Sequence, residues 1–318
     1  LRADKRDGLN NAAMVSGYRG SPLGGIDSLM LGNADELAEN NIQFVPGLNE
    51  DLGATTVWGS QLANRNFDGK FDGVLGMWYG KAPGVDRSGD AIRHANVCGV
   101  DPKGGVLLVA GDDPASKSST LASESEFALL HFQTPILYPG TVQEVADYGR
   151  IGYELSRYSG LWVSLKIVTN VADGYSTIKV GPGRVQMQRP DFEWDGTPWQ
   201  HTQQDALFGP FAVRQELEIH EGRMEATDAF TRLNQLDTVS GATSDARIGL
   251  VAAGKTYYDL REALDRMGLD EAALKQRGVR LYKPAVVWPL EANGVREFAR
   301  GLDTIVVFEE KRAFIEMF

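Results

Sequence analysis

This 318-residue sequence has a single cysteine, and it lacks long apolar runs and an excess of basic residues. Cys98 is its one cysteine, so no disulfide can form within the chain, and we expect a reducing, cytoplasmic setting. No apolar run approaches the roughly 18 residues that cross a bilayer, which argues against a membrane protein. The net charge of −11 argues against nucleic acid and anionic membranes as partners, because both attract clustered Lys and Arg.

Glycine, by contrast, is abundant. The chain has 36 glycines, against roughly 22 expected at a typical content of ~7%. Many of them lie between Gly17 and Gly111. Because glycine permits positive φ and a close approach of the backbone, we expect this part of the chain to form tight loops around a ligand.

Short apolar runs alternate with helical patterns through the first part of the chain. The expected strands are residues 13–16, 43–45, 73–77, 105–110, 135–138 and 161–168. The expected helices are residues 26–39, 50–64, 87–97, 121–130 and 141–157. This alternation predicts an α/β fold with a doubly wound, mostly parallel sheet over residues 1–182. Ligands of such sheets bind at the carboxyl ends of the strands.

The pattern changes after Pro182. Residues 183–245 are expected to be a linker that contains one amphipathic helix, residues 211–236, with Val213, Leu217, Phe230 and Leu233 among its apolar positions. A second, smaller α/β unit is predicted over residues 246–318. The chain begins without methionine and stops just after a strand-like run, so we expect both ends to be cut from a longer polypeptide and this last unit to be truncated.

Polar, glycine-rich loops follow three of the expected strands, at residues 16–25, 77–90 and 110–120. The first loop matches neither of the usual nucleotide-binding fingerprints. Glu50 follows another strand, after a turn at Pro46-Gly47, and lies in the first turn of a predicted helix. Taken by itself, such a carboxylate is favoured by the helix macrodipole by roughly 0.3–1 kcal/mol. Four polar features at the ends of parallel strands, however, indicate a binding site.

Four motifs in this region match a known enzyme family in order and spacing. They are Tyr18-Arg19-Gly20-Ser21-Pro22, Asn49-Glu50, Lys81-Ala82-Pro83-Gly84 and Asp112-Asp113-Pro114. With them, the chain resembles the thiamine-diphosphate-dependent 2-oxoacid:ferredoxin oxidoreductases, in particular their indolepyruvate ferredoxin oxidoreductase branch, over nearly its whole length. The resemblance implies a pyrimidine-binding domain of a thiamine enzyme, followed by a domain like the C-terminal domain of transketolase. It also implies oxidative decarboxylation of aryl 2-oxoacids to acyl-CoA, with ferredoxin as electron acceptor.

The resemblance also implies roles for individual residues. Glu50 would be catalytic, because a carboxyl group at this position hydrogen-bonds N1′ of the cofactor's aminopyrimidine ring and so promotes loss of the thiazolium C2 proton. The other expected cofactor-binding residues are Lys81, Gly84, Asp112 and Asp113, and the expected substrate-binding residues are Ser21 and Arg19. Simpler interpretations stay open: Ser21, Asp112 and Asp113 suit turn caps, and Lys81 suits a solvated surface position.

Parts that such an enzyme needs are absent from the sequence. There is no Gly-Asp-Gly motif for the Mg²⁺ that holds the diphosphate, and one cysteine cannot bind 4Fe–4S clusters. We therefore predict no metal ligand in this chain, and expect the diphosphate-binding domain to come from elsewhere in the protein or from a partner chain, in a homo-oligomer. The isolated chain is expected to be inactive and to bind thiamine diphosphate weakly.

Two other functions remain open from the sequence. One is a non-redox thiamine-dependent enzyme. The other is a non-catalytic assembly or nucleotide-binding module, in which Glu50 would be solvated and loosely held.

Overall fold

The computed structural model describes residues 1–205, 207–242 and 244–318. Residues 206 and 243, which fall in the predicted linker, lie outside the described residues. In the described part of the chain, no helix is both long enough and apolar enough to cross a membrane.

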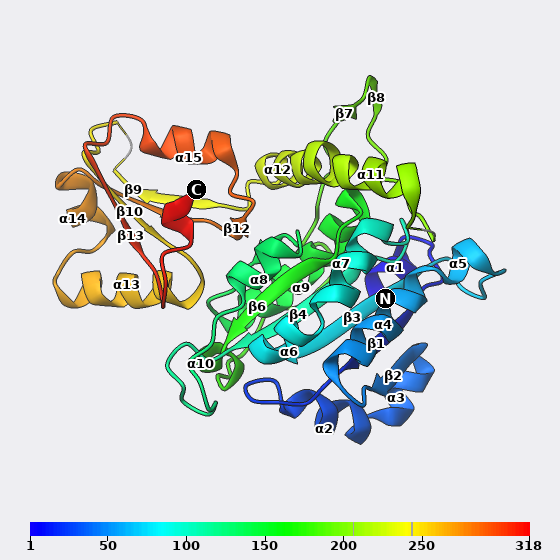
Figure 1. Ribbon diagram of the computed structural model, residues 1–318. Coiled ribbons are helices and arrows are strands. Elements are labelled where there is room, and N and C mark those ends of the chain that lie inside the picture. The colour runs from blue at the N-terminus through cyan, green and yellow to red at the C-terminus, as the bar shows by residue number, and fades with distance from the viewer. Residues whose placement is uncertain (206, 243) are drawn as a thin grey trace.

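Seven strands form the larger sheet, in the order β12-β5-β6-β4-β3-β1-β2 (Figure 1). They are β1 (Ala12–Gly17), β2 (Ile42–Pro46), β3 (Val74–Lys81), β4 (Val106–Asp112), β5 (Ile136–Leu137), β6 (Val163–Val168) and β12 (Val286–Trp288). All neighbours are parallel except β12 and β5, which are antiparallel. Every residue of β4 and β6 is buried, as expected for continuous apolar strands covered on both faces. The predicted α/β fold is confirmed.

Helices cover both faces of this sheet. They are α1 (Arg2–Arg6), α2 (Gly25–Gly32), α3 (Ala34–Glu39), α4 (Glu50–Gln61), α5 (Ala63–Asn66), α6 (Ala82–Arg87), α7 (Gly89–Cys98), α8 (Glu126–His131), α9 (Val142–Ser159) and α10 (Thr169–Ala172). The chain moves outward from β1 to β2 and then back across the sheet to β3 and β4. Right-handed connections in opposite directions lie on opposite faces, so β1 and β3 flank the point where the connections change face.

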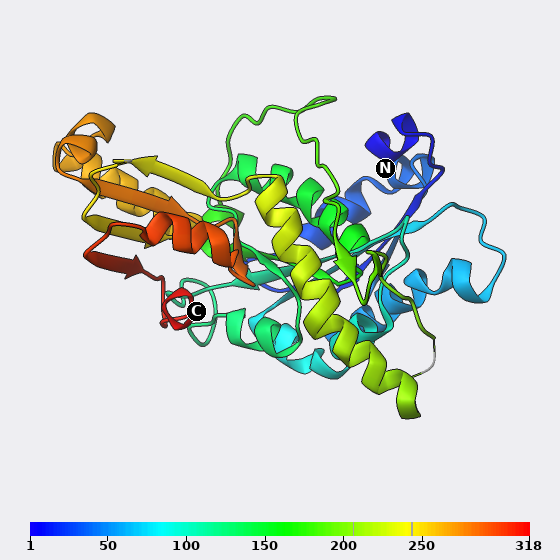
Figure 2. The ribbon, with the colours of Figure 1, turned by 90° about the horizontal axis from the view of Figure 1, so that it is seen from above.

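A long helical segment lies across the first α/β unit, which contains the larger sheet, as Figure 2 shows. It comprises α11 (Gly209–Glu218), a π-helical turn (Ile219–Arg223) and α12 (Met224–Leu233), and it follows a small hairpin of β7 (Glu193–Trp194) and β8 (Thr197–Pro198). Phe230 is buried, but Val213, Leu217 and Leu233 are exposed, in contrast to the predicted apolar face. The buried face of the helix instead carries an ion pair: the Arg223 guanidinium donates to Glu218 at 2.9 Å, and both side chains are fully buried.

A second sheet has the order β13-β10-β11-β9. Its strands are β9 (Thr238–Gly241), β10 (Ile248–Ala252), β11 (Val279–Lys283) and β13 (Thr304–Phe308), with helices α13 (Gly254–Arg266), α14 (Glu271–Gln276) and α15 (Ala292–Ala299) and a final 3-10 turn (Ile315–Met317). Its first strand, β9, lies within the predicted linker, and β12 leaves this unit to join the larger sheet. The predicted boundaries at 182 and 245 stay a prediction.

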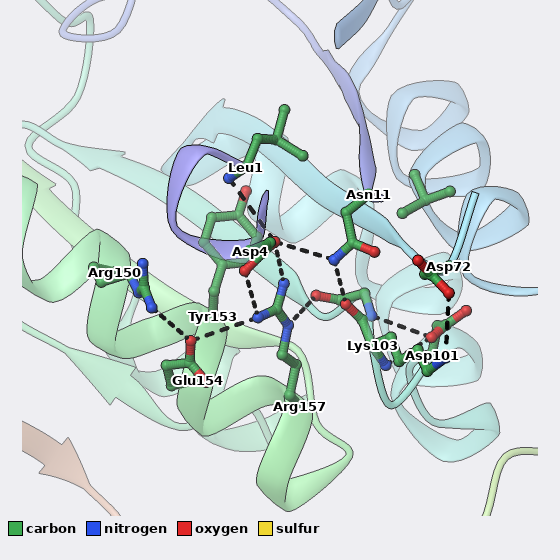
Figure 3. Close-up of polar contacts among 12 residues, drawn as sticks. Leu1, Asp4, Asn11, Asp72, Asp101, Lys103, Arg150, Tyr153, Glu154 and Arg157 are labelled. Atoms are coloured by element: carbon green, nitrogen blue, oxygen red, sulfur yellow. Dashed lines mark hydrogen bonds and ion pairs between the residues drawn. The ribbon is translucent and has the colours of Figure 1, made fainter. Parts of the chain in front are cut away.

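Buried polar contacts connect α1, α9 and the segments that precede β1 and β4, at the amino ends of the strands of the larger sheet (Figure 3). Arg157 on α9 donates to both carboxylate oxygens of Asp4 on α1, at 2.9 and 2.7 Å, and to the carbonyl of Gly104 at 2.9 Å. Asn11, just before β1, donates to Asp4 at 3.0 Å. This network lies at the end of the sheet opposite the loops that follow the strands, so it serves stability.

Candidate functional site

The three predicted loops lie at the carboxyl ends of β1, β3 and β4, around the switch point between β1 and β3. Ligands of open α/β sheets bind at such a switch point. Ser21 Oγ of the first loop lies in hydrogen-bond contact with Ser118 Oγ of the third. A Cβ built on Gly20 of the first loop would lie 3.1 Å from Cδ of Lys81 at the end of β3. The fold thus brings the three loops together, as the sequence predicted.

Close backbone packing brings Glu50 to the carboxyl end of β1. After the turn at Pro46-Gly47, the N–H of Gly47 donates to the carbonyl of Gly17, the last residue of β1, at 2.8 Å. Asn49 then caps α4 by accepting from the N–H of Leu52 at 2.8 Å. A Cβ on Gly53 would lie 2.9 Å from the Cα of Gly17, so glycine is required for α4 to begin this close to β1.

The Glu50 side chain is half-buried and lies against the first turn of α6. A Cβ on Gly84 would lie 2.5 Å from Cγ of Glu50 and 2.9 Å from its Oε1. The indole N–H of Trp78, a buried residue of β3, donates to the backbone carbonyl of Glu50 at 2.9 Å. Glu50 and Gly84, which the sequence placed in the same site, are therefore in contact, and Glu50 is partly shielded from water.

Asp113 organises the third loop from within. Its carboxylate accepts from the N–H groups of Lys117 and Ser118, each at 2.8 Å. Burial of Asp113 favours its neutral form, but the hydrogen bonds from Ser118 and Lys117 outweigh burial and lower its pKa to about 2. Asp113 is thus a turn-forming anion, in line with the simpler of its two predicted interpretations, and it orients Ser118 toward Ser21.

Asp112 is fully buried below this loop. It accepts from the N–H of Ser125 at 2.9 Å and from its hydroxyl at 2.6 Å, and it lies 3.7 Å from the ammonium of Lys166. Burial raises the pKa of Asp112 to about 6, although the charge of Lys166 acts in the opposite direction. All these partners are protein groups behind the loop, so Asp112 supports the loop from below.

Arg19 of the first loop, which was expected to bind substrate, is exposed to solvent.

Several polar residues at this end of the sheet were not found from the sequence. Lys166 on β6 is buried, pairs with Glu126, and lies 4.3 Å from the ring centre of Tyr138. Tyr138 in turn donates to Glu310, which follows β13 of the second unit. A signal for Lys166 was available: it is a charged residue in a continuous apolar strand, and such a charge must be paired. No sequence signal revealed the contact across the two units.

Neither a metal site nor a reactive thiol accompanies these loops in the part of the chain that is described. Within residues 1–205, 207–242 and 244–318, no group of three or more His, Cys, Asp and Glu side chains is placed to hold a metal ion. Cys98 is buried, and burial raises the pKa of its thiol to about 11. A buried, neutral thiol of this kind is structural, as the sequence indicated.

Comparison with known proteins gives consistent matches over most of the chain. The family model described as Indolepyruvate oxidoreductase domain matches residues 238–318, starting at the first residue of β9. Indolepyruvate oxidoreductase subunit IorA of Methanothermobacter marburgensis is 24% identical over 316 residues, which cover 99% of this chain and 46% of that protein. The subunit IorA of Archaeoglobus fulgidus is 23% identical over 218 residues, or 69% of this chain and 32% of that protein.

The chain is similar to indolepyruvate oxidoreductase subunit IorA. It spans less than half the length of these curated relatives. A solved 2-oxoglutarate:ferredoxin oxidoreductase from Magnetococcus marinus, with 2-oxoglutarate, coenzyme A and succinyl-CoA bound, has a TM-score of 0.66 at 15% identity and covers 93% of this chain and 54% of that one. At this identity the likeness shows a shared fold. It extends over both α/β units, which supports the predicted fold class.

Proposed function

We propose that this chain supplies the pyrimidine-binding side of a thiamine-diphosphate-dependent 2-oxoacid oxidoreductase. The complete protein would oxidatively decarboxylate aryl 2-oxoacids such as indolepyruvate to acyl-CoA, with ferredoxin as electron acceptor. The observation that carries this proposal is the position of Glu50, half-buried at the β1–β3 switch point with its carboxyl group against Gly84. The similarity to indolepyruvate oxidoreductase subunits supports it.

The residues at this switch point fit the pyrimidine half of the cofactor. A carboxyl group that is partly shielded from water can share a proton with a ring nitrogen. Leu52 and Tyr18, both partly exposed beside the start of α4 and the end of β1, offer apolar surface for an aromatic ring. When bound, thiamine diphosphate supplies the carbanion chemistry, and the part of this chain is to hold a proton at the pyrimidine nitrogen through Glu50.

The remaining parts of the reaction are assigned outside this chain. The diphosphate and its Mg²⁺ need an oxygen-rich site, and the described residues contain no metal-binding cluster. The sequence has one cysteine, too few for a 4Fe–4S cluster. We assign these groups, with CoA and ferredoxin binding, to other parts of the complete protein or to a partner chain within a homo-oligomer. In a non-catalytic module, Glu50 was expected to be solvated and loosely held, whereas it is half-buried against Gly84.

The test is Glu50→Gln in the complete enzyme that contains this chain. Glutamine keeps the size of the side chain but cannot exchange a proton at the pyrimidine nitrogen. Because acid–base catalysis contributes about 10²–10⁴-fold, we expect hydrogen–deuterium exchange at the cofactor's C2 to slow by about that factor. NMR of the acid-quenched cofactor measures the exchange. The dissociation constant for the cofactor is expected to change by less than about tenfold, because most of its contacts remain.

Asp51→Asn provides a matched control. Asp51 is the other carboxylate in the first turn of α4, so its loss has the same effect on the helix macrodipole. We expect the exchange rate of this variant to stay at the wild-type level. Equal exchange rates in Glu50→Gln and the wild-type enzyme would refute the proposed role of Glu50.

A further inference from the structure

A cavity of about 290 Å³ lies beside Lys81, and both α/β units line it. The end of β3 and α6 provide one wall, the loop after β4 provides a second, and the segment after β13 provides a third. The lining residues include Lys81, Asp86, Ser119, Glu124, Lys311 and Arg312. Gly84, which contacts Glu50, is three residues from Lys81. Pro83 lines the cavity and the next residue, Gly84, contacts Glu50, so the cavity lies one residue from the Glu50 contact, and the second unit takes part in it.

Specific contacts fix the segment after β13 in this position. The Lys311 ammonium donates to the carbonyl of Ala122 at 2.7 Å, and Arg312 forms an ion pair with Glu124. The Arg312 guanidinium lies 4.4 Å from the ring centre of Phe127. Phe314, only 2% exposed, packs edge-on against the same ring at 5.2 Å. The two cationic groups are thus held at the wall of the cavity by an anchored segment.

The charges of the lining favour an anion. Lys81, Lys311 and Arg312 outnumber the two carboxylates, Asp86 and Glu124, and leave one net positive charge. Asp86, Lys311 and Arg312 are all exposed, so water weakens the charge of each. Lys81, by contrast, is partly buried. An ammonium has three donors and a guanidinium has five, whereas the contact to Ala122 uses one donor of Lys311. Lys311 and Arg312 therefore retain donors that suit a carboxylate.

We propose that Lys311 and Arg312 of the second unit, together with Lys81, bind the carboxylate of the 2-oxoacid substrate. This rests on the proposed function, since it takes the substrate class from there. The second unit then has a binding role in addition to its structural one. The carboxylate leaves as CO₂ in the decarboxylation, so contacts to it stabilise the bound substrate more than the later states. Their loss is expected to raise KM and to change kcat little.

The experiment compares Lys311→Ala, Arg312→Ala and Arg312→Lys in the complete enzyme. Because a hydrogen bond between charged groups is lost, we expect KM for the 2-oxoacid to rise about tenfold or more in the alanine variants, with kcat and KM for CoA within about twofold. Arg312→Lys keeps the charge and is expected to recover most of the loss. Arg266→Ala, which removes an exposed cation paired with Glu262 on α13, is the control and should match the wild-type enzyme.

A pair of inhibitors separates charge recognition from a structural role. Phenylpropionate carries a carboxylate, whereas its amide has the same shape without the charge. In Arg312→Ala we expect the inhibition constant of the carboxylate to rise about tenfold and that of the amide to stay unchanged. Equal weakening of both inhibitors, a parallel rise in KM for CoA, or an unchanged KM for the 2-oxoacid would each overturn the proposal. Hydrogen–deuterium exchange at C2, measured without substrate, is expected to proceed at the wild-type rate in these variants. This exchange tests the role of Glu50 and KM tests the carboxylate contacts, so the failure of one proposal can be told from the failure of the other.

Discussion

Glu50 and Gly84 show how a contact between two residues far apart in sequence defines the candidate site. Glu50 opens α4, and Gly84 lies in the first turn of α6, after a different strand. Any side chain at position 84 would occupy the space of the Glu50 carboxyl group, since a Cβ would lie 2.5 Å from Cγ of Glu50. The backbone of α6 therefore serves as the surface on which the carboxyl group rests.

We expect Gly84→Ala to disable the site without unfolding the protein. The added methyl group must push the Glu50 carboxyl group away by about 1 Å, and such a displacement can lower a catalytic rate by about 10²-fold. The measurement is C2 hydrogen–deuterium exchange of thiamine diphosphate in the complete enzyme, together with the thermal midpoint. Gly59→Ala is the control: it lies on α4 with open space around it, so this change should leave exchange intact and stabilise the helix by about 0.5–1 kcal/mol. Normal exchange in Gly84→Ala would show that the contact does not orient Glu50.

The site residues differ in how far the sequence could predict them. Glu50, Gly84, Lys81 and Ser21 were predicted by motif order, and their loops do meet. Asp112 was expected to bind cofactor, yet the structure surrounds it with Ser125 and Lys166. The Asp112 carboxylate lies near Lys166 because β4 and β6 are neighbouring strands. Which strands are neighbours is a property of the tertiary fold, so no local pattern predicts this contact. Lys311 and Arg312 were missed for the same reason, because no local pattern predicts contact with a loop about 190 residues earlier.

At the scale of elements, α1 is attached to the first unit through the ion pair between Asp4 and Arg157 of α9 (Figure 3). Each side chain in this pair is about 5% exposed. A short helix of five residues has little stability of its own, so this contact and its neighbours must hold it in place. Burial of Asp4 opposes its ionisation, but the hydrogen bonds and the charge of Arg157 outweigh burial, and the pKa of Asp4 is lowered.

We expect Asp4→Asn to lower the free energy of unfolding by about 3 kcal/mol at pH 7, because the buried Arg157 loses its two-pronged anion and keeps only the longer contact to Glu154, at 3.5 Å. Since the folded-state pKa of Asp4 is lowered, its contribution is complete above the unfolded value of about 3.9 and is lost as the pH falls through the folded value. The difference between variant and wild type should therefore narrow below about pH 4, as urea unfolding over a pH series measures.

The control for this pair is Asp147→Asn. Asp147 also forms a two-pronged pair with an arginine, Arg184, at 2.8 and 2.6 Å, but that arginine is exposed. Its loss should cost no more than about 1 kcal/mol. A loss of similar size in both variants would contradict the importance of burial for the Asp4–Arg157 pair.

Prediction of helices and strands succeeded where the apolar pattern was strong. It failed where buried polar groups determine which face of a helix is buried. All six strands predicted for the first part of the chain are present, because buried parallel strands give continuous apolar runs. The helix predicted over residues 26–39 divides at Asn33, which separates α2 from α3. The helix predicted over residues 211–236 contains a π-helical turn, and its buried face includes Gln215, Glu218 and Arg223. An amphipathic pattern cannot predict burial of an ion pair.

For the molecule as a whole, the two α/β units are joined through the larger sheet and its core. β12 comes from the second unit in sequence but completes the larger sheet beside β5. Val286 and Phe314 belong to the same buried cluster as the strands of the first unit. Tyr138 donates to Glu310 across the boundary. A strand shared in this way means that neither unit can unfold fully without exposing part of the other's core.

The two units are therefore expected to unfold together, and Phe314→Ala tests this. Removing a buried phenylalanine should cost about 3–5 kcal/mol, since it leaves a cavity in the shared core. In urea, near-UV and far-UV circular dichroism should show one coincident transition in the wild-type chain. In the variant, both signals should shift together to lower urea. Phe67→Ala, at an exposed position, is expected to change stability by less than about 0.5 kcal/mol. Two separated transitions in the wild-type chain, or a shift in only one signal of the variant, would mean that the units fold independently. The segment that contains Lys311 and Arg312 would then be attached less firmly than its contacts indicate.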